Sequence, residues 1–250
     1  MPSIYMYHAV GNEEQTAGAD PYYAVSELVF SEHIKCIPQS IPLAKQLKDG
    51  SKVNHSCITF DDGHLSNYLV AYPLLLENKL SAEFYINTNM VGTEHFMSWD
   101  QLKEMNDSGM SIQSHGHNHH YFSDMNDSEI TEELKVSKEL IESNLGNLVT
   151  VFAPPGGRTN KRVTRIAKSL GYKCIANSRP GIVPYFKSFE VSRFAILKHT
   201  NTNTIMAWQR RWSLATIKEV ARYRIFRIAK LVLGNKRYDK VRMKLLTGSK

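Results

Sequence analysis

Strand-like and helix-like segments alternate along most of this chain, and this alternation restricts its fold more than any other feature. Short apolar runs typical of buried strands cover residues 3–8, 56–60, 82–86, 110–113, 149–153 and 172–176. Segments with helical spacing cover residues 30–37, 67–78, 98–109, 128–145 and 163–170. Repeated strand–helix units predict parallel strands covered by helices, in a barrel or a doubly wound sheet. In both architectures the chemistry gathers in loops at the carboxyl ends of the strands.

Several helix ends are marked by particular residues. Ser98 followed three residues later by Gln101 is typical of a capping box at a helix start. Gly146 and Gly171 stand where two of the predicted helices end, and glycine is the residue favoured just past a helix. These signals place the loops between the predicted elements.

Length and composition indicate a globular protein with its own core. The chain has 250 residues, of which 42% are hydrophobic and 22% charged, which is ordinary for a folded domain. Its three cysteines are scattered and odd in number, which argues against a disulfide scaffold or a Cys-rich zinc finger. No run approaches the roughly 20 apolar residues of a membrane span. The first residues lack the basic and long apolar regions of a signal peptide, so we expect a cytoplasmic protein.

Charge divides the chain into two parts. Residues 205–250 hold 13 Lys and Arg against two acidic residues, a net charge of +11, whereas residues 1–204 hold 18 against 22, a net charge of −4. We therefore expect a main domain over residues 1–204 and a basic tail over residues 205–250. The mildly acidic main domain argues against a nucleic-acid partner.

Within the tail, residues 217–233 carry apolar side chains at helical spacing, with basic side chains mostly on the other side. Two interpretations remain open. An amphipathic helix commonly packs on the core and leaves its charged face in water. A basic amphipathic helix can also lie on an anionic membrane surface.

The first chemical cluster is Thr-Phe-Asp-Asp-Gly at residues 59–63, directly after a predicted strand. Two adjacent carboxylates, Asp61 and Asp62, repel each other and therefore indicate a nearby cation. The alternative is a solvated Asp-Gly turn, which is a common turn sequence.

The second cluster is Ser-His-Gly-His-Asn-His-His at residues 114–120. His115 and His119 are four residues apart, so on a helical turn they would share one face and bind one metal ion. A His-rich surface loop is the alternative. Position 116 is not Glu, which excludes the zincin pattern in which that Glu is the base. The base must then come from elsewhere, and the spare carboxylate of the first cluster fits.

The third cluster is Phe-Ala-Pro-Pro-Gly-Gly at residues 152–157. Its prolines fix the backbone and its glycines let a ligand approach, so a backbone N–H here is a candidate to stabilise an oxyanion. A rigid turn is the alternative.

Taken together, the three clusters indicate a metal hydrolase. One carboxylate and two imidazoles make an open three-ligand site, and the second carboxylate takes a proton from water.

This arrangement resembles the polysaccharide deacetylase family, the NodB-homology domain of carbohydrate esterase family 4, over about residues 3–199. Residues 59–63 match the first motif of the family in full. His115-x-x-x-His119 matches the second, and residues 154–157 match the third in part.

The resemblance implies a distorted (β/α) barrel of about seven parallel strands and N-deacetylation of an amino sugar in a polysaccharide, an oligosaccharide or a lipid-linked precursor. It implies that Asp61 is the general base. It also implies that Asp62, His115 and His119 bind one divalent metal ion, usually zinc, and that Gly156 offers its N–H to the oxyanion. Pro155 and Gly157 of the same turn, and His8 in a Tyr-His pair near the start, are expected near the substrate.

The sequence departs from the family pattern in four of its motifs, and the Asp/Trp segment of the fourth is not recognisable. Gly116 replaces a usual Ser or Thr, which removes one supporting hydrogen bond. Ala153 replaces a usual Arg that orients the base, and Arg193 either supplies that charge or is a surface residue. The general acid has a candidate in His199, with His8, His117 and His120 as alternatives.

Two other functions remain open from the sequence alone. One alternative is a catalytically inactive carbohydrate-binding member of this fold, and the other is a different metal-dependent hydrolase, such as a phosphoesterase. The intact Asp and His pairs argue against the first, and the motif spacing argues against the second. A membrane-bound tail would place a cytoplasmic deacetylase at the inner face of the membrane, near lipid-linked sugars.

Overall fold

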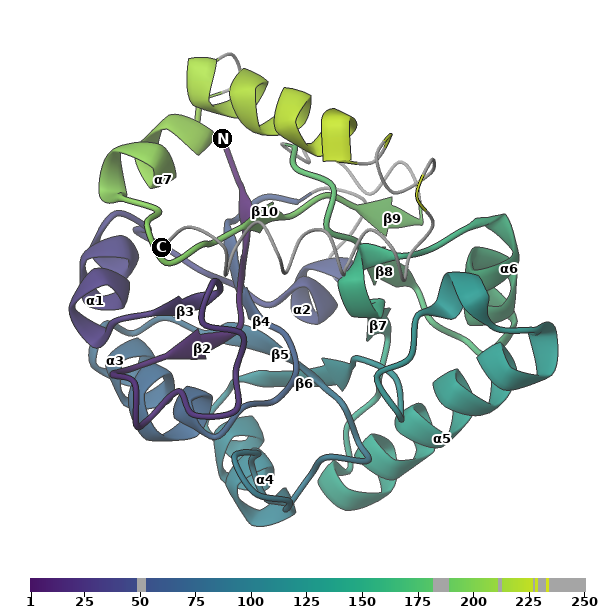
Figure 1. The fold of residues 1–250 in the computed structure, drawn as a ribbon. Coiled ribbons are helices and arrows are strands. Elements are labelled where there is room, and N and C mark those ends of the chain that lie inside the picture. The colour runs from purple at the N-terminus through teal and green to yellow at the C-terminus, as the bar shows by residue number, and fades with distance from the viewer. Residues whose placement is uncertain (49–52, 182–188, 211–212, 227, 229–232, 234–250) are drawn as a thin grey trace.

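The computed structural model describes residues 1–48, 53–181, 189–210, 213–226, 228 and 233. Its main sheet has eight strands in the order β10-β1-β4-β5-β6-β7-β8-β9, and all neighbouring strands pair in parallel (Figure 1). The strands are β1 (Ile4–Tyr7), β4 (Cys57–Phe60), β5 (Ala82–Ile86), β6 (Ser111–Ser114), β7 (Val151–Phe152), β8 (Cys174–Ala176), β9 (Glu190–Val191) and β10 (Phe194–Ala195). The curled sheet with its surrounding helices confirms the predicted distorted (β/α) barrel.

The two edges of the sheet are joined by one short segment of chain. β9 pairs with β8 and β10 pairs with β1, yet only Ser192 and Arg193 separate β9 from β10. The segment 190–195 therefore acts as one kinked strand that brings the sheet back to its beginning. Counted in this way, the barrel has about seven strand positions, as predicted.

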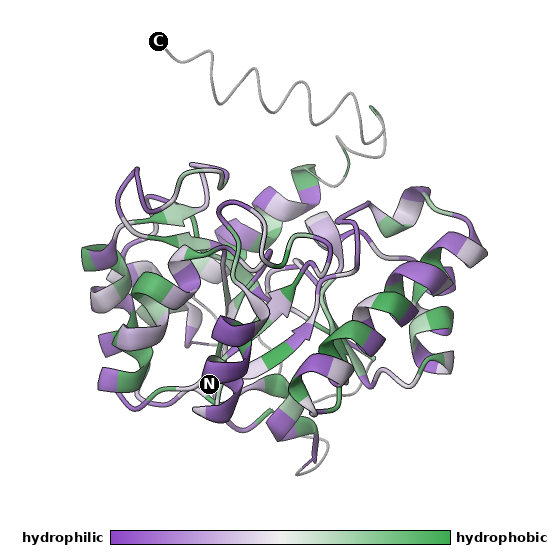
Figure 2. Cartoon of the chain, turned by 90° about the horizontal axis from the view of Figure 1, so that it is seen from below, coloured by the Kyte–Doolittle hydropathy of each residue, from purple (hydrophilic) through white to green (hydrophobic). Residues whose placement is uncertain are grey.

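Helices surround the strands, as Figures 1 and 2 show. They are α1 (Glu27–Lys35), α2 (Leu43–Lys48), α3 (Tyr72–Glu77), α4 (Trp99–Asp107), α5 (Asp127–Leu145), α6 (Lys161–Ser169) and α7 (Thr202–Trp208). Short elements in the loops are the β2–β3 pair (Ala9–Val10 and Ala24–Val25), the π-helical turn Asn67–Ala71 and the 3-10 turns Phe122–Asp124 and Pro155–Gly157.

The helix ends agree with the capping signals, and the boundaries differ by a few residues. The Ser98–Gln101 capping box is present at the start of α4, and Gly146 ends α5 with φ 72°. The helix predicted over residues 67–78 divides into a π-turn and α3. The N–H of Tyr72 bonds the carbonyl of Asn67, and Pro73 next to it has no N–H to donate. The sequence pattern did not reveal α2, β9, β10 or α7.

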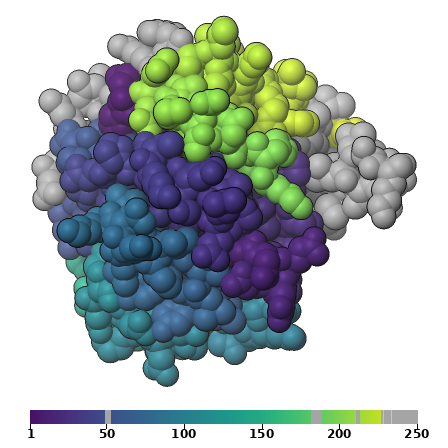
Figure 3. Space-filling view, turned by 90° about the vertical axis from the view of Figure 1, so that its left-hand side faces the viewer, coloured from purple at the N-terminus to yellow at the C-terminus, as the bar shows by residue number. Residues whose placement is uncertain are grey.

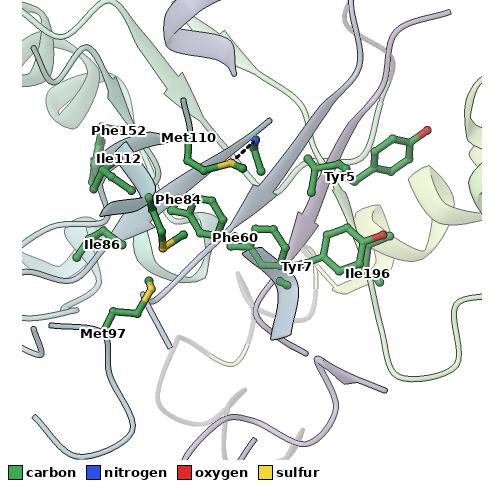
Figure 4. Close-up of a cluster of buried hydrophobic side chains, with 14 of the residues drawn as sticks. Tyr5, Tyr7, Phe60, Phe84, Ile86, Met97, Met110, Ile112, Phe152 and Ile196 are labelled. Atoms are coloured by element: carbon green, nitrogen blue, oxygen red, sulfur yellow. Dashed lines mark hydrogen bonds between the residues drawn. The ribbon is translucent and has the colours of Figure 1, made fainter. Parts of the chain in front are cut away.

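A large apolar cluster lies between the strands and the outer helices. It includes a stack of aromatic rings across neighbouring strands, with Phe60 centred 5.4 Å from Tyr7 and 4.8 Å from Phe84 (Figure 4). Such cross-strand aromatic packing fixes the register of β1, β4 and β5. The same register fixes where the loops after these strands begin.

A smaller cluster fills the inside of the barrel, from strand residues that alternate with those of the outer cluster. Leu43 and Ala44 of α2 belong to it, so α2 closes this interior. Glu83 of β5 points inward and accepts hydrogen bonds from the N–H of Ala44 and from the Tyr85 hydroxyl. Burial raises the pKa of Glu83 despite these bonds.

The chain continues past residue 204 as part of the packed body. The Trp208 ring of α7 stacks on Phe194 at 4.6 Å, and both side chains are buried. The expected boundary after residue 204 therefore falls inside α7. Residues 214–226 form a further helix, whereas residues 227, 229–232 and 234–250 of the predicted tail lie outside the described residues. Among the described residues, no helix combines the length and the apolarity that crossing a membrane requires.

Candidate active site

The two adjacent carboxylates follow β4 and turn in different directions. Asp61 is 3% exposed, and its N–H bonds the carbonyl of Tyr7 as if the strand continued. Asp62 has φ 74° and Gly63 has φ 80°. A left-handed residue directly after an extended one reverses the direction of the chain. The turn therefore separates the two carboxylates, with Asp61 inside the barrel and Asp62 at its mouth.

Asp61 is held by Arg193, the residue at the kink between β9 and β10. Two nearly parallel hydrogen bonds join the guanidinium to the carboxylate, at 2.6 and 2.8 Å. The remaining donors of Arg193 reach the hydroxyl of Thr59 and the carbonyl of Asn177, and its side chain has no exposed surface. Arg193 is therefore a buried partner of Asp61. The structure does not place it at the surface, which was the alternative open from the sequence.

Opposing effects set the charge of Asp61. Burial alone would raise the pKa of its carboxyl group, but the charge and hydrogen bonds of Arg193 outweigh burial and hold the pKa below its usual value. The carboxylate is thus ionised and fixed in orientation, which is the state that a general base requires.

Asp62 meets the two histidines of the second cluster. Its Oδ1 atom lies 3.2 Å from Nε2 of His115 and 3.1 Å from Nε2 of His119. One ligand atom from each of the three residues fits within 4.8 Å of the others. Burial alone would lower the pKa of His119, but the hydrogen bond that its Nε2 donates to Asp62, together with the charge of Asp62, outweighs burial and raises that pKa. The three side chains therefore converge on one point at the mouth of the barrel.

The histidines meet through a loop, and the helical turn that the spacing suggested is not formed. No helix is present over residues 115–120, where Gly116 has φ 86° and His119 has φ 56°. A Cβ atom at Gly116 would lie 3.2 Å from the ring of Phe122, so both the backbone angle and the space favour glycine there. This explains why the usual Ser or Thr is absent.

The loop is fixed by Glu133, a buried residue of α5. One carboxylate oxygen of Glu133 accepts the N–H groups of His117 and Asn118 at 2.8 and 2.9 Å, and the other accepts the Asn118 side-chain amide. On the opposite side, the Thr88 hydroxyl bonds Nδ1 of His117 at 2.9 Å. His117 therefore supports the loop, while His120 is exposed.

His8 follows β1 and lies at the same end of the barrel. Its electrostatic neighbours include Asp61 and Asp62, and burial lowers its pKa. Its ring packs 4.4 Å from that of Tyr23, and its buried Nδ1 atom has no hydrogen-bond partner among the described residues. His199 is exposed at the rim, where its ring lies 5.8 Å from that of Tyr22. The structure thus brings His8 to the carboxylates, whereas His199 is an exposed residue packed on Tyr22.

The turn Pro155–Gly157 follows β7, beside the loop that carries His115. Gly156 has φ 62° and Gly157 has φ 66°. A Cβ atom at Gly157 would lie 2.6 Å from the side chain of Ser178, so only glycine fits there. The ring of Tyr121 lies 3.0 Å from the position of a Cβ atom on Gly156, which closes one side of the turn. The N–H of Gly157 bonds the carbonyl of Pro154, so the amide of Gly156 is the better candidate to face a ligand.

Sequence reasoning missed several of these residues. Glu133 stands on an ordinary amphipathic helix, and nothing in its local pattern marks it. The Tyr22-Tyr23 pair in the long loop before β3 was a weak signal, because adjacent aromatic residues in a loop often pack over a site. Tyr121, next to the His cluster, was another.

The donor set fits a divalent metal ion. Two imidazole nitrogens and one carboxylate oxygen are the ligands typical of an open catalytic zinc site. Asp62 and His119 both have positive φ, which is uncommon for residues other than glycine. Backbone strain of this kind clusters at functional sites, where the surrounding structure over-determines it.

Comparison with known proteins gives a consistent result. The model of the family described as polysaccharide deacetylase matches residues 48–175. YxkH of Bacillus subtilis, named for the same family, is 28% identical over 189 residues, 71% of this chain and 64% of YxkH. A poly-beta-1,6-N-acetyl-D-glucosamine N-deacetylase of Staphylococcus aureus is 26% identical over 209 residues, 74% of this chain and 72% of that protein.

Among solved structures, a polysaccharide deacetylase from Bacillus cereus superposes with a TM-score of 0.74 at 25% identity, covering 83% of this chain and 68% of that one. The deacetylase PplD of Streptococcus pyogenes superposes with a TM-score of 0.72 at 24% identity, covering 84% and 98%. The fold of this chain is therefore shared with known deacetylases.

Proposed function

This chain belongs to the polysaccharide deacetylase family, and on that premise we propose that it removes an N-acetyl group from an amino sugar of a glycan by metal-dependent hydrolysis. The observation that carries the proposal is the convergence of Asp62, His115 and His119 beside the ionised Asp61–Arg193 pair. A ligand set and a separate base are the two components that such a hydrolysis requires.

Asp62, His115 and His119 would hold the divalent ion, with zinc as the ion that best fits two imidazoles and one carboxylate. When bound, this ion supplies Lewis acidity toward water and the amide carbonyl. Asp61 is then the residue that accepts a proton from the attacking water. Arg193 is a positioning residue, because its two hydrogen bonds hold the carboxylate ionised and in one orientation.

The hydrolysis balances with water as the only co-reactant. A bond forms between the water oxygen and the acetyl carbon, the carbon–nitrogen bond breaks, and the sugar nitrogen takes a proton to leave as an amine beside acetate. The Gly156 N–H is placed to stabilise negative charge on the carbonyl oxygen. His8 is better placed than His199 to touch the substrate, because it lies beside the carboxylates with an unpartnered Nδ1 atom.

Acetate release from a panel of N-acetylated oligosaccharides and lipid-linked sugars, with and without a chelator, tests this function. We expect release that stops with chelator and returns with added zinc. Asp61→Asn should keep the metal and lose about 10²–10⁴-fold in rate, whereas Asp62→Asn should lose metal affinity. The His8→Ala and His199→Ala variants, compared at saturating substrate, separate the two candidates for protonating the amine.

Two results would replace the proposal. Glycan binding without acetate release by the metal-loaded protein would indicate an inactive carbohydrate-binding member. Hydrolysis of a phosphate ester in place of the amide would indicate another metal hydrolase.

A further inference from the structure

The helix over residues 214–226 exposes its aliphatic side chains to solvent. Its start is capped by Ser213, whose hydroxyl accepts the N–H of Thr216 at 3.1 Å. The exposed fractions are 75% for Leu214, 53% for Ile217, 66% for Ile225 and 61% for Ile228. Residue 228 is also helical. These values are those of side chains that contact little else of the described structure.

The exposed residues form one stripe. At about 100° per residue, the four aliphatic residues and Ala221 fall within roughly 80° of the helix surface. Lys218 borders this apolar stripe on one side and Arg224 on the other, and both are exposed. The opposite face carries the partly or fully buried residues Ala215, Thr216, Glu219, Val220 and Tyr223.

This orientation is the reverse of an ordinary surface helix, which turns its apolar stripe to the core. It is also local. Among the described residues, the only isoleucines with large exposure are the three on this stripe. Figure 3 shows the green-yellow residues of this part of the chain at the molecular surface. Contiguous apolar surface bordered by charge marks a contact site for another surface.

The helix also lies beside the rim of the candidate active site. Arg222 is paired with Glu219 at 3.0 Å, and its electrostatic neighbours include Tyr22 and Tyr23. Tyr23 in turn packs on His8. A surface that binds the stripe would therefore lie close to the mouth of the barrel.

We propose that this stripe docks the protein on an anionic lipid bilayer. The apolar residues enter the boundary between headgroups and acyl chains, and Lys218 and Arg224 pair with phosphate headgroups. Charge favours lipid over a second copy of the chain. Residues 205–250 carry a net charge of +11, so two such segments repel each other, whereas an anionic surface attracts them.

The docked orientation has a consequence for the substrate. Because Arg222 lies close enough to Tyr22 and Tyr23 to interact with them electrostatically, and Tyr23 packs on His8, a bilayer under the stripe would bring membrane-borne glycans near the site. This part rests on the proposed deacetylase function and deepens it, with a lipid-linked N-acetylated sugar as the substrate class. Anionic lipid is enriched on the cytoplasmic leaflet, which fits a location at the inner face of the membrane.

The docking is tested by co-sedimentation of the full-length protein with vesicles, in the absence of substrate. We expect binding to vesicles of phosphatidylglycerol and phosphatidylcholine at low salt, with weaker binding as salt rises. Vesicles of phosphatidylcholine alone should bind about tenfold less. Because neither metal nor substrate is involved, the result does not depend on whether the enzymatic proposal holds.

Two variants and their controls locate the surface. Ile217→Ser, Ile225→Ser and Ile228→Ser together should weaken binding at least about tenfold, while Leu28→Ser, Leu69→Ser and Leu148→Ser, which remove equally exposed leucines elsewhere, should bind like the wild type. Lys218→Gln with Arg224→Gln should weaken binding to anionic vesicles. Lys161→Gln with Lys173→Gln, the control that removes two positive charges elsewhere, should weaken it less. Circular dichroism checks that each variant is folded.

Equal binding by the stripe variant and its leucine control would overturn the proposal. So would a wild-type protein that ignores vesicles but forms a dimer that the stripe variant loses, because the stripe would then contact a second copy. If docking holds, the rate on a lipid-linked N-acetylated sugar in anionic vesicles should fall in the stripe variant. The rate on a soluble oligosaccharide should stay unchanged.

Discussion

Charged side chains usually lie at the surface of a protein and aliphatic side chains in its core. The inside of the barrel, beneath its mouth, and the helix over residues 214–226 depart from this pattern in opposite directions. Inside the barrel, Asp61 and Arg193 are charged and almost fully buried. On the helix, Leu214 and Ile225 are aliphatic and mostly exposed. Buried charge needs partners within the molecule, and the structure supplies them as hydrogen bonds. Exposed apolar surface finds its partner outside the molecule. The first region therefore satisfies its buried charges within the molecule, whereas the second is covered only by contact with another surface.

The largest expected effect comes from removing a ligand at the mouth. His115→Ala or His119→Ala should lose most of the bound metal and bring acetate release to background, because each supplies one of three ligands. Metal content of the purified protein and acetate release measure this. His120→Ala, a change in an exposed neighbour, is the matched control and should keep both. Full metal occupancy in both ligand variants would remove the metal assignment.

The second largest effect is expected at the buried ion pair, which can be compared with an exposed ion pair of the same nitrogen–oxygen distance. Arg193 and Asp61 approach to 2.6 Å with almost no exposure, and Arg165 and Asp127 approach to 2.6 Å with more than half of each side chain exposed. Arg193→Gln leaves a buried carboxylate without its charge partner and should lower the free energy of unfolding by about 3–5 kcal/mol. Arg165→Gln should lower it by about 0–1 kcal/mol.

Urea unfolding followed by circular dichroism measures both values. A loss of similar size for the two variants would mean that the folded protein does not depend on Arg193 as the charge partner of Asp61. Arg193→Lys should recover only part of the loss, because an ammonium group cannot make the paired hydrogen bonds of a guanidinium.

These two comparisons show what the sequence could reveal. Asp61, Asp62, His115 and His119 stand in compact motifs, so local spacing indicated a metal hydrolase, and the family resemblance divided the roles of base and ligands among them. The strand–helix alternation predicted parallel strands in either a barrel or a doubly wound sheet, and the family resemblance selected the barrel. Arg193 was only an open alternative, because its pairing with Asp61 spans 132 positions and depends on the kink that closes the sheet.

Other features could not be read from the sequence, for physical reasons. Helical spacing predicted that His115 and His119 meet on a helical turn. The two residues do meet, but through a loop, since positive φ at Gly116 and His119 depends on packing around that loop. The tail had the pattern of an amphipathic helix, but periodicity does not say which face meets the protein. The structure shows that the face with Thr216 and Tyr223 packs on the protein.

A smaller effect is expected from Glu133, which holds the loop between the two histidines. Glu133→Gln keeps the size of the side chain, but it replaces one of the two accepting oxygens with an N–H donor and removes the negative charge that the loop N–H groups face. Residues that orient metal ligands typically contribute about 10–100-fold to metal affinity. Zinc titration against a competing chelator measures this, and Glu132→Gln, one position away on the exposed face, is the control. Loss of stability without loss of zinc affinity would assign Glu133 to folding alone.

The smallest effect concerns the stripe itself and separates a solvent-exposed face from a packed one. Ile225 is 66% exposed, whereas Ile205 of α7 has no exposed surface. Ile205→Ala should lower the free energy of unfolding by about 2–5 kcal/mol, because it leaves a cavity. Ile225→Ala should change it by no more than about 0.5 kcal/mol, and the better helix propensity of alanine acts in the stabilising direction. Urea unfolding without lipid measures both.

A cost of 2 kcal/mol or more at Ile225 would show that the protein already covers the stripe in solution, and the surface would then be unavailable for a membrane. If the cost is negligible in solution but Ile225→Ala still weakens vesicle binding, the stripe is retained for its contact with lipid and contributes nothing to the fold.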